Sequence, residues 1–181
     1  MSDETMDESP DDDVVSKERD AALEELASES DELSYGVESP AAGEVYTNFR
    51  VMHVESILYD LGDASPFVHL MEAESPYRYL AIPLALADAV ALHHAHNSVE
   101  GRRPSTSELT MTILTRLQAE IIAARIVRYE DGVYYAELDL MTPKGHEIFD
   151  CRTSDALTLA LRQRVPAPIL CAEEVLSLYL G

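Results

Sequence analysis

Negative charge is concentrated in the first quarter of this 181-residue chain. Residues 1–44 contain 16 acidic and 2 basic side chains, a net charge of −14, whereas residues 45–181 contain 18 and 11, a net charge of −7. The first segment also has few large apolar side chains, so it cannot bury enough surface to offset the entropy lost on ordering. We expect residues 1–44 to form a largely disordered acidic tail and linker, with a short amphipathic helix over 16–33, before a single compact domain over 45–181.

Strand-like and helix-like segments alternate along residues 45–181. Strands are expected at 51–60, 66–71, 77–82, 121–129, 133–140, 146–150 and 169–170, and helices at 84–96, 105–117, 153–165 and 173–179. Pro83 is expected to begin the first of these helices. The pair Asp131-Gly132 predicts a hairpin turn, and Ser105 with Glu108 predicts a capping box. These elements predict the α+β class, with a mixed, largely antiparallel β-sheet packed with three to four helices.

The remaining composition narrows the class of protein. No window contains the roughly 18 consecutive apolar residues of a membrane span. The first residues lack the basic and apolar regions of a secretory signal, so we expect a cytoplasmic protein with no membrane partner. Cys151 and Cys171 lack metal-ligand or redox spacing and predict buried free thiols. No glycine-rich phosphate loop occurs, and no organic cofactor is expected.

The segment DCRTSD, residues 150–155, lies where a predicted strand ends and a predicted helix begins. Free backbone N–H groups at a helix start, together with hydroxyl groups and Arg152, would bind a phosphate. The carboxylates of Asp150 and Asp155 could hold Mg²⁺ or Mn²⁺. In the alternative interpretation, Thr153 or Ser154 caps the helix, Asp155 compensates the helix dipole, and Arg152 pairs with Asp150.

Two further clusters have weaker signals. Arg102 and Arg103 precede the helix expected at 105, where they form either a second wall of an anion site or an exposed basic loop. His93, His94 and His96 lack the i, i+4 pair of the two-histidine zinc motif, so a helix end that carries histidines is favoured over a zinc site.

Three segments together are similar to one known family. The sequence DCRTSDALTLALR at 150–162, followed by VPAPI at 165–169, resembles the D-x-R-P-S-D-A-I-A-L-A-x-R and A-P-I signature of the bifunctional nuclease domain. RPSTSEL at 103–109 resembles the R-P-x-T-H-D-L segment of that family, and LAIP at 80–83 falls where its L-P-I-x-I-G segment lies. The matching order covers about residues 48–178. The resemblance implies an α+β domain, usually dimeric, whose plant members have RNase and DNase activity.

The resemblance also implies site residues at the positions that match. Those positions are Arg103, Thr106, Glu108, Arg152, Ser154 and Asp155. On chemical grounds we add Asp150 and Asp88. The expected catalytic residues are Asp155, Asp150, Glu108 and Ser154, the expected phosphate-binding residues are Arg152, Arg103 and Thr106, and the expected metal ligands are Asp150, Asp155 and Asp88.

The chain departs from the family pattern at several positions. The His-Asp pair of the family is replaced by Ser107-Glu108, which removes a candidate general acid or base, and the proline of R-P-S-D is replaced by Thr153. Asp88 is the acid that remains where the family has an acidic helix start. If catalysis in relatives depends on that histidine, this chain is a weak or inactive nuclease.

Two functional hypotheses follow. The first is a metal-assisted nuclease that hydrolyses phosphodiester bonds of RNA or single-stranded DNA, with Mg²⁺ or Mn²⁺ as its cofactor. The second is a non-catalytic, dimeric interaction or regulatory domain that retains the family fold. The net charge of −21 favours the second, because nucleic-acid affinity depends on phosphate neutralisation, although a local basic wall can override net charge. The acidic tail either keeps the chain soluble or occupies the site as a mimic of nucleic acid.

Overall fold

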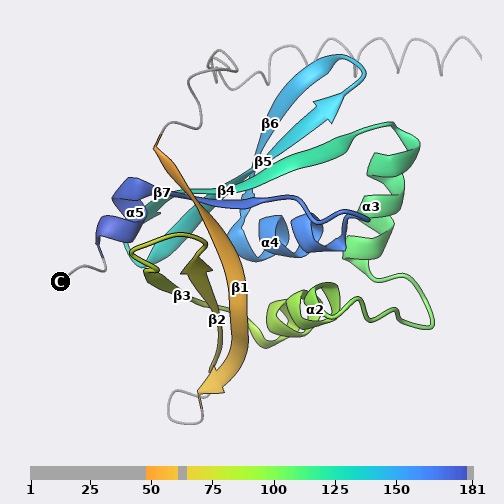
Figure 1. Ribbon diagram of the computed structural model, residues 1–181. Helices are drawn as coiled ribbons and strands as arrows, with labels where there is room; N and C mark the ends of the chain where they lie inside the picture. Colours follow the sequence, from red (N-terminus) through yellow and green to blue (C-terminus); the bar gives the residue numbers. More distant parts are fainter. Residues whose placement is uncertain (1–47, 61–64, 179–181) are drawn as a thin grey trace, which may run out of the picture. The chain divides into compact units, whose positions relative to one another are not determined.

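The computed structural model describes residues 48–60 and 65–178 (Figure 1). These residues belong to Ser39–Gly181, one of the two units into which the chain divides. The expected acidic tail, its boundary at residue 44 and the helix expected over 16–33 lie outside the described residues.

In the described part of the chain, seven strands form one mixed sheet in the order β3-β2-β1-β7-β4-β5-β6. The strands are β1 (Phe49–Asp60), β2 (Ser65–Glu72), β3 (Tyr79–Pro83), β4 (Glu120–Glu130), β5 (Val133–Thr142), β6 (Gly145–Arg152) and β7 (Ile169–Ala172). The β4–β7 pair is parallel, and the other neighbouring strands run antiparallel. Strand β7 therefore joins two antiparallel halves, β1–β3 and β4–β6.

Four helices pack with this sheet in the described part of the chain: α2 (Leu86–His96), α3 (Thr106–Arg116), α4 (Thr153–Arg162) and α5 (Glu173–Ser177). Helix α2 packs over β1 and β2, and α4 packs over β4, β5 and β6 beside it (Figure 1). Helix α3 packs against α4. The α+β class with a mixed, largely antiparallel sheet is confirmed. None of the described helices combines the length and the apolar character needed to cross a membrane.

The core fixes where α4 begins. Strand β2 alternates buried and partly exposed residues, as expected for a strand with one face on the core. Leu92 of α2 and Leu157 of α4 are fully buried in the same core cluster as Val68 and Leu70 of β2, and each such leucine contributes about 1.5–3 kcal/mol to folding. On α4, the buried Ala156 and Ala160 lie four residues apart and pack against Ala136 of β5. Because alanine is small, α4 lies close to the sheet and its first turn is held at the end of β6.

A network of ion pairs attaches α5 to the strands β1 and β2. Glu72 is 1% exposed and accepts hydrogen bonds from the side chains of Arg50 and Arg78, at 2.6 Å and 2.8 Å. Arg78 also pairs with Glu173 at the start of α5, at 2.6 Å. The hydrogen bonds from Arg78 are the main reason that the pKa of Glu72 falls from 4.5 to about 2. A carboxylate buried in this way is charged throughout the neutral range.

Several expected element boundaries differ in the structure, among them the start of β3, the start of α2 and the end of α4. Strand β3 begins at Tyr79 rather than at 77, because Tyr77 has a φ of 60° and belongs to a turn in which its N–H donates to Glu74 O at 3.0 Å. Pro83 ends β3 and does not begin the next helix, which starts at Leu86. Helix α4 ends at Arg162 rather than at 165.

The two turn motifs behave as predicted. The hairpin between β4 and β5 turns at Asp131 and Gly132, whose φ angles are 51° and 83°. Ser105 and Glu108 form both hydrogen bonds of the capping box at the start of α3.

Candidate functional site

Three helices begin around one hollow of about 630 Å³. Its lining includes Asp88 from the first turn of α2, Thr106 and Ser107 from the first turn of α3, and Ser154 and Asp155 from the first turn of α4. The first turn of a helix has N–H groups without intrahelical partners and carries a partial positive charge. Neither α2 nor α4 has a side-chain cap on these groups. These helix starts favour an anion at the site, which we call the Arg152 hollow, although its charged side chains are two carboxylates and one arginine.

One arginine lies between two carboxylates at this hollow. Arg152 donates from Nε to Asp155 Oδ2 at 2.8 Å and from Nη2 to Asp155 Oδ1 at 2.9 Å. Its Nη1 donates to Asp88 Oδ2 at 3.2 Å, and Ser154 Oγ donates to the same oxygen at 3.3 Å. The bonds to Asp155 are the main reason that the pKa of Arg152 is raised. The Arg152 side chain is 65% exposed, so an incoming anion can still reach the guanidinium.

Hydroxyl groups supply most of the other polar lining. They belong to Ser105, Thr106, Ser107, Thr110, Ser154 and Thr158. Thr110 and Thr158 were absent from the sequence-based set of site residues. Each lies four residues after a predicted site residue, Thr106 or Ser154, on the same helical face, so the i, i+4 spacing could have revealed both.

Glu108 faces away from the Arg152 hollow. Ser105 N donates to Glu108 Oε2 at 2.7 Å, and Arg162 Nη1 donates to Glu108 Oε1 at 3.2 Å. The bond from the Ser105 backbone is the main reason that the pKa of Glu108 is lowered. Glu108 borders a separate hollow of about 350 Å³ that it shares with Arg162. In this arrangement its carboxylate fixes the start of α3 and the orientation of α3 relative to α4.

Two other predicted residues also lie outside the lining of the Arg152 hollow. Asp150 is exposed on β6, opposite Glu137 of β5. Arg103 is exposed in the loop before α3. The structure thus brings together five of the predicted residues, namely Asp88, Thr106, Arg152, Ser154 and Asp155. Roles for Asp150, Arg103 and Glu108 in catalysis or phosphate binding stay predictions.

The cysteine next to the site is not a nucleophile at neutral pH. Cys151 precedes Arg152 and is a free thiol that is half-buried, not fully buried as expected. Burial, together with the nearby carboxylates of Asp155 and Asp150, raises its pKa to about 12. Because the thiolate is the reactive form, covalent catalysis by Cys151 is disfavoured. Cys171 is a buried free thiol whose pKa is raised to about 12 for the same main reason.

The carboxylates of the hollow offer a minimal set of ligands for a divalent cation. Mg²⁺ is often bound by one or two carboxylates, with water and substrate oxygens as its other ligands. Asp88 and Asp155 can supply two carboxylates, since both contact the guanidinium of Arg152. Across residues 48–60 and 65–178 no group of three His, Cys, Asp or Glu side chains has the arrangement of a metal site. A cation held by Asp88 and Asp155 would therefore compete with Arg152 and depend on the substrate for further ligands.

Comparisons with known proteins identify the family. The family model described as the bifunctional nuclease domain matches residues 68–179, which include every residue that lines the Arg152 hollow. Two proteins of Mycobacterium tuberculosis, "Uncharacterized protein MT1877" of strain CDC 1551 / Oshkosh and "Uncharacterized protein Rv1829" of strain ATCC 25618 / H37Rv, are each 33% identical over 112 residues. The matched region covers 62% of this chain and 65% of each relative, so it spans less than two thirds of their length. The chain belongs to the bifunctional nuclease domain family.

Proposed function

We propose that the protein hydrolyses phosphodiester bonds of RNA or single-stranded DNA in the Arg152 hollow. Family membership supports a nuclease-related function in general. The observation that carries the finer proposal is the meeting of one exposed guanidinium, two carboxylates and three helix starts around a single hollow. These groups provide both a place for a phosphate and acidic oxygens beside it.

The first task of the site is to bind the phosphate. Arg152 can donate to its non-bridging oxygens, and the starts of α2 and α4, which have no side-chain cap, would contribute partial positive charge. The hydroxyls of Thr106 and Ser154 lie on the same lining. Positive groups placed in advance stabilise the negative charge that develops on the phosphate oxygens during hydrolysis.

The second task is to activate water. Asp88 and Asp155 would hold Mg²⁺ or Mn²⁺, and Ser154 Oγ keeps Asp88 oriented by its hydrogen bond of 3.3 Å. When bound, such a cation polarises the phosphate and lowers the pKa of water. The residues of this chain then act by binding the phosphate and holding the carboxylates in place.

A second candidate function is a dimeric interaction or regulatory domain that binds an anion without cleaving it. Two observations favour it. Both carboxylates of the hollow are already paired with Arg152, and Ser107 lines the hollow where the resemblance places a histidine. A site without an imidazole lacks the most common general acid or base.

Cleavage assays separate the two functions. Labelled single-stranded RNA and DNA are incubated with Mg²⁺ or Mn²⁺ and the wild type, Arg152→Ala or Asp155→Asn, each checked for folding by thermal unfolding. The control is Arg128→Ala, which removes an exposed arginine paired with Glu130 on β4. We expect metal-dependent cleavage that is lost in both site variants and kept in the control. No cleavage with any metal, or activity unaffected by both site variants, would contradict the nuclease proposal and favour the non-catalytic function.

A further inference from the structure

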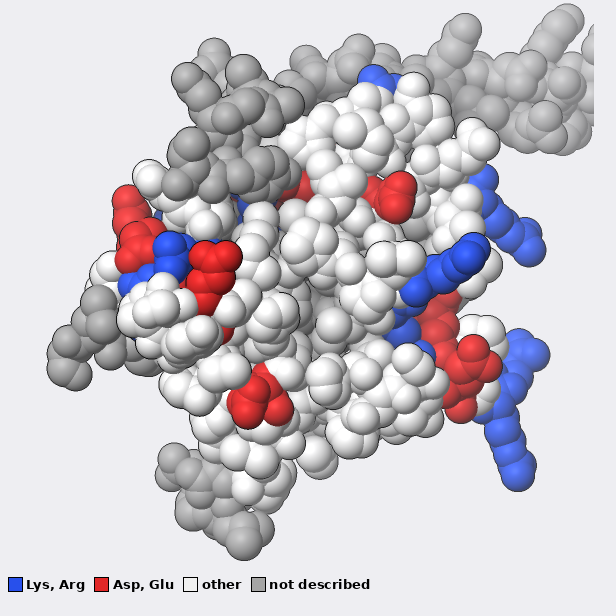
Figure 2. All heavy atoms as spheres, viewed as in Figure 1, with Lys and Arg blue, Asp and Glu red and all other residues white. Residues whose placement is uncertain are grey.

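The arginines in the described part of the chain are of two kinds: those that form an ion pair with a carboxylate and those that do not. Six have a carboxylate partner: Arg50, Arg78, Arg125, Arg128, Arg152 and Arg162. Four have no ion-pair partner within the described part of the chain: Arg102, Arg103, Arg116 and Arg164. These four lie in the loop before α3, at the end of α3 and just after α4. In Figure 2, Lys and Arg side chains stand along the right-hand edge of the domain, where Figure 1 has α3 and the loop before it.

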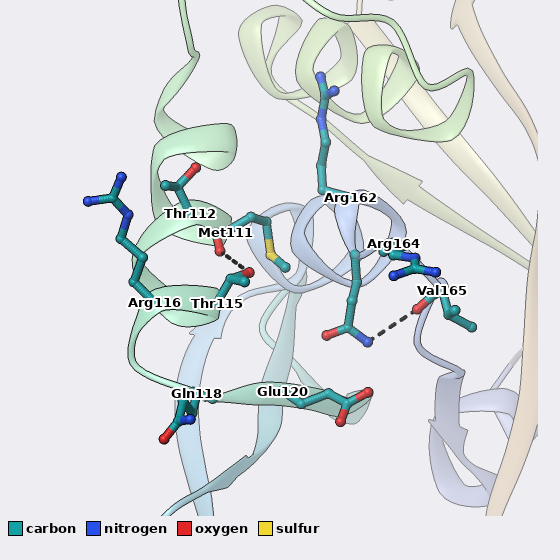
Figure 3. Close-up of a pocket in the computed structure, with 11 residues that line it drawn as sticks. Met111, Thr112, Thr115, Arg116, Gln118, Glu120, Arg162, Arg164 and Val165 are labelled. Carbon is teal, nitrogen blue, oxygen red and sulfur yellow. Dashed lines mark hydrogen bonds between the residues drawn. The ribbon is translucent and has the colours of Figure 1, made fainter.

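A second hollow lies between the end of α3, the start of β4 and the end of α4. Its volume is about 840 Å³, and we call it the Arg116 hollow. Figure 3 shows Arg116 and Arg164 on opposite sides of it, with Met111 and Thr115 between them. Thr112 of α3 and Gln118 contribute further polar groups to the lining.

Arg162 also lines this hollow, but its charge is offset by Glu108, and Figure 3 shows its side chain pointing away from Met111 and Thr115. Its side chain is 9% exposed, and its Nη1 donates to Val99 O at 2.8 Å and to Glu108 Oε1 at 3.2 Å. Its Nε is buried without a hydrogen-bond partner in the described ranges. Apart from Arg162, which is paired with Glu108, the charged residues of the lining are Arg116 and Arg164 against one acidic residue, Glu120. The lining of this hollow therefore carries a net positive charge, whereas residues 45–181 as a whole have a net charge of −7.

The size and chemistry of the Arg116 hollow select the class of ligand. A volume of this order is typical of sites for small molecules or for one unit of a polymer. Guanidinium groups bind phosphate oxygens, and their planar faces also stack on nucleobases. The bases of a duplex are stacked inside the helix, whereas those of a single strand can turn into a hollow. A nucleotide unit of a single strand therefore fits this combination of positive charge and partly apolar lining.

We propose that the Arg116 hollow binds a nucleotide unit of single-stranded RNA or DNA at a distance from the Arg152 hollow. This inference rests on the proposed function, since the strand bound here is the one that the Arg152 hollow would cleave. Helix α3 separates the two sites: Thr106 and Thr110 line the Arg152 hollow, and Thr112 and Arg116 line the other. The bound strand crosses α3, and the accessory contact offsets the repulsion expected from an acidic protein.

Binding measurements test this proposal. Fluorescence anisotropy of a labelled single-stranded oligonucleotide is measured with the full chain in EDTA, so that no metal-dependent cleavage intervenes. The variant Arg116→Ala/Arg164→Ala is compared with Arg128→Ala/Lys144→Ala, which removes two positive charges elsewhere and so controls for net charge. The first variant should bind about tenfold more weakly at low salt, and its slope of log Kobs against log salt should fall in magnitude by about 1.4, because each phosphate contact on a single strand contributes about 0.7. The control should change affinity by less than about twofold.

Several outcomes would overturn the proposal. These are equal losses in the two double variants, an unchanged salt slope, equally tight binding of a duplex, or binding of a free mononucleotide as tight as that of the oligonucleotide. The charge-conserving Arg116→Lys/Arg164→Lys variant should keep the salt slope, and thermal unfolding confirms that each variant is folded.

The same experiments distinguish this proposal from the proposed function. If Arg116→Ala/Arg164→Ala loses binding but no form of the protein cleaves nucleic acid, binding at the Arg116 hollow is supported and the proposed hydrolysis is contradicted. If cleavage depends on Asp155 but binding is unchanged in Arg116→Ala/Arg164→Ala, the proposed hydrolysis is supported and binding at the Arg116 hollow is contradicted.

Discussion

Arg152 is the residue that organises the candidate site. It is the last residue of β6 and the N-cap position of α4, so the strand and the helix together fix its backbone. Its guanidinium contacts Asp88 from α2 and Asp155 from α4. Because these side chains are partly exposed, such pairs contribute only about 1 kcal/mol or less to folding. The value of the arrangement is therefore to place three charged groups together, not to stabilise the domain.

Ser107 offers a test for the missing general acid or base. It lines the Arg152 hollow at the position where the resemblance places a histidine. We expect Ser107→His to raise phosphodiester cleavage by about tenfold or more, since general acid–base catalysis contributes about 10²–10⁴-fold when well positioned. The new activity should change with pH near 6–7, where an imidazole titrates. The measurement is the cleavage rate of single-stranded RNA across this pH range.

Ser107→Gln is the matched control for that substitution, because its side chain is large and polar but does not titrate. An equal rise in both variants, or a rise without pH dependence, would show that side-chain size rather than proton transfer limits the reaction.

At the scale of the elements, the ion pairs that hold α5 against the sheet make the stability of the protein depend on pH. Helix α5 is tied to the sheet through Glu173, Arg78 and the buried Glu72, whose pKa is about 2 instead of 4.5. A lowered pKa in the folded state stabilises the protein above the ordinary pKa, and this stabilisation is lost as the pH falls from about 4.5 to about 2. We expect Glu72→Gln to lower the free energy of unfolding at pH 7 by roughly 2–3 kcal/mol. The difference from the wild type should shrink across that acid range, as measured by urea unfolding.

Glu130→Gln is the control for this acid dependence, because Glu130 is exposed and pairs with the exposed Arg128. It should change stability by less than about 1 kcal/mol at any pH. If the difference in free energy of unfolding between the wild type and Glu72→Gln stayed constant from neutral pH to pH 2, the lowered pKa of Glu72 would be contradicted.

The order and type of the elements could be predicted from the sequence, because each segment carries a local signal. The capping box at Ser105 and the turn at Asp131 depend only on neighbouring residues, and both formed as expected. The start of α2 could not be predicted locally. Pro83 is paired with Phe67 of β2, and this tertiary pairing extends the strand past the residue that resembles a helix start.

The site was partly predictable for a related reason. The motifs identify side chains, but the fold decides which way each one faces. In the capping box at the start of α3, the carboxylate of Glu108 accepts from Ser105 N and also from Arg162, so it does not face the Arg152 hollow. Asp88 and Asp155 are 67 positions apart in the sequence, and only the packing of α2 against α4 brings them to one guanidinium.

At the scale of the whole molecule, charge is the property most open to test. The chain has a net charge of −21, of which residues 1–44 carry −14. Deleting residues 1–44 should tighten binding of single-stranded nucleic acid at low salt, because it removes long-range repulsion. The difference should vanish as salt is raised, since the Debye length falls to about 8 Å at 0.15 M. Anisotropy titrations over a range of salt concentrations measure this effect, and identical affinities at low salt would contradict it.

The position of β7 has a consequence for the order in which the chain is made. This strand, Ile169–Ala172, lies between β1 and β4 at the centre of the sheet, yet it is the last of the described strands to be synthesised. The halves β1–β3 and β4–β6 can each pair as they leave the ribosome, because their strands are neighbours in sequence. They cannot join until β7 emerges. Until then, each half exposes an unpaired strand edge, so the newly made chain passes through a stage in which chaperones or faulty association compete with the closing of the sheet.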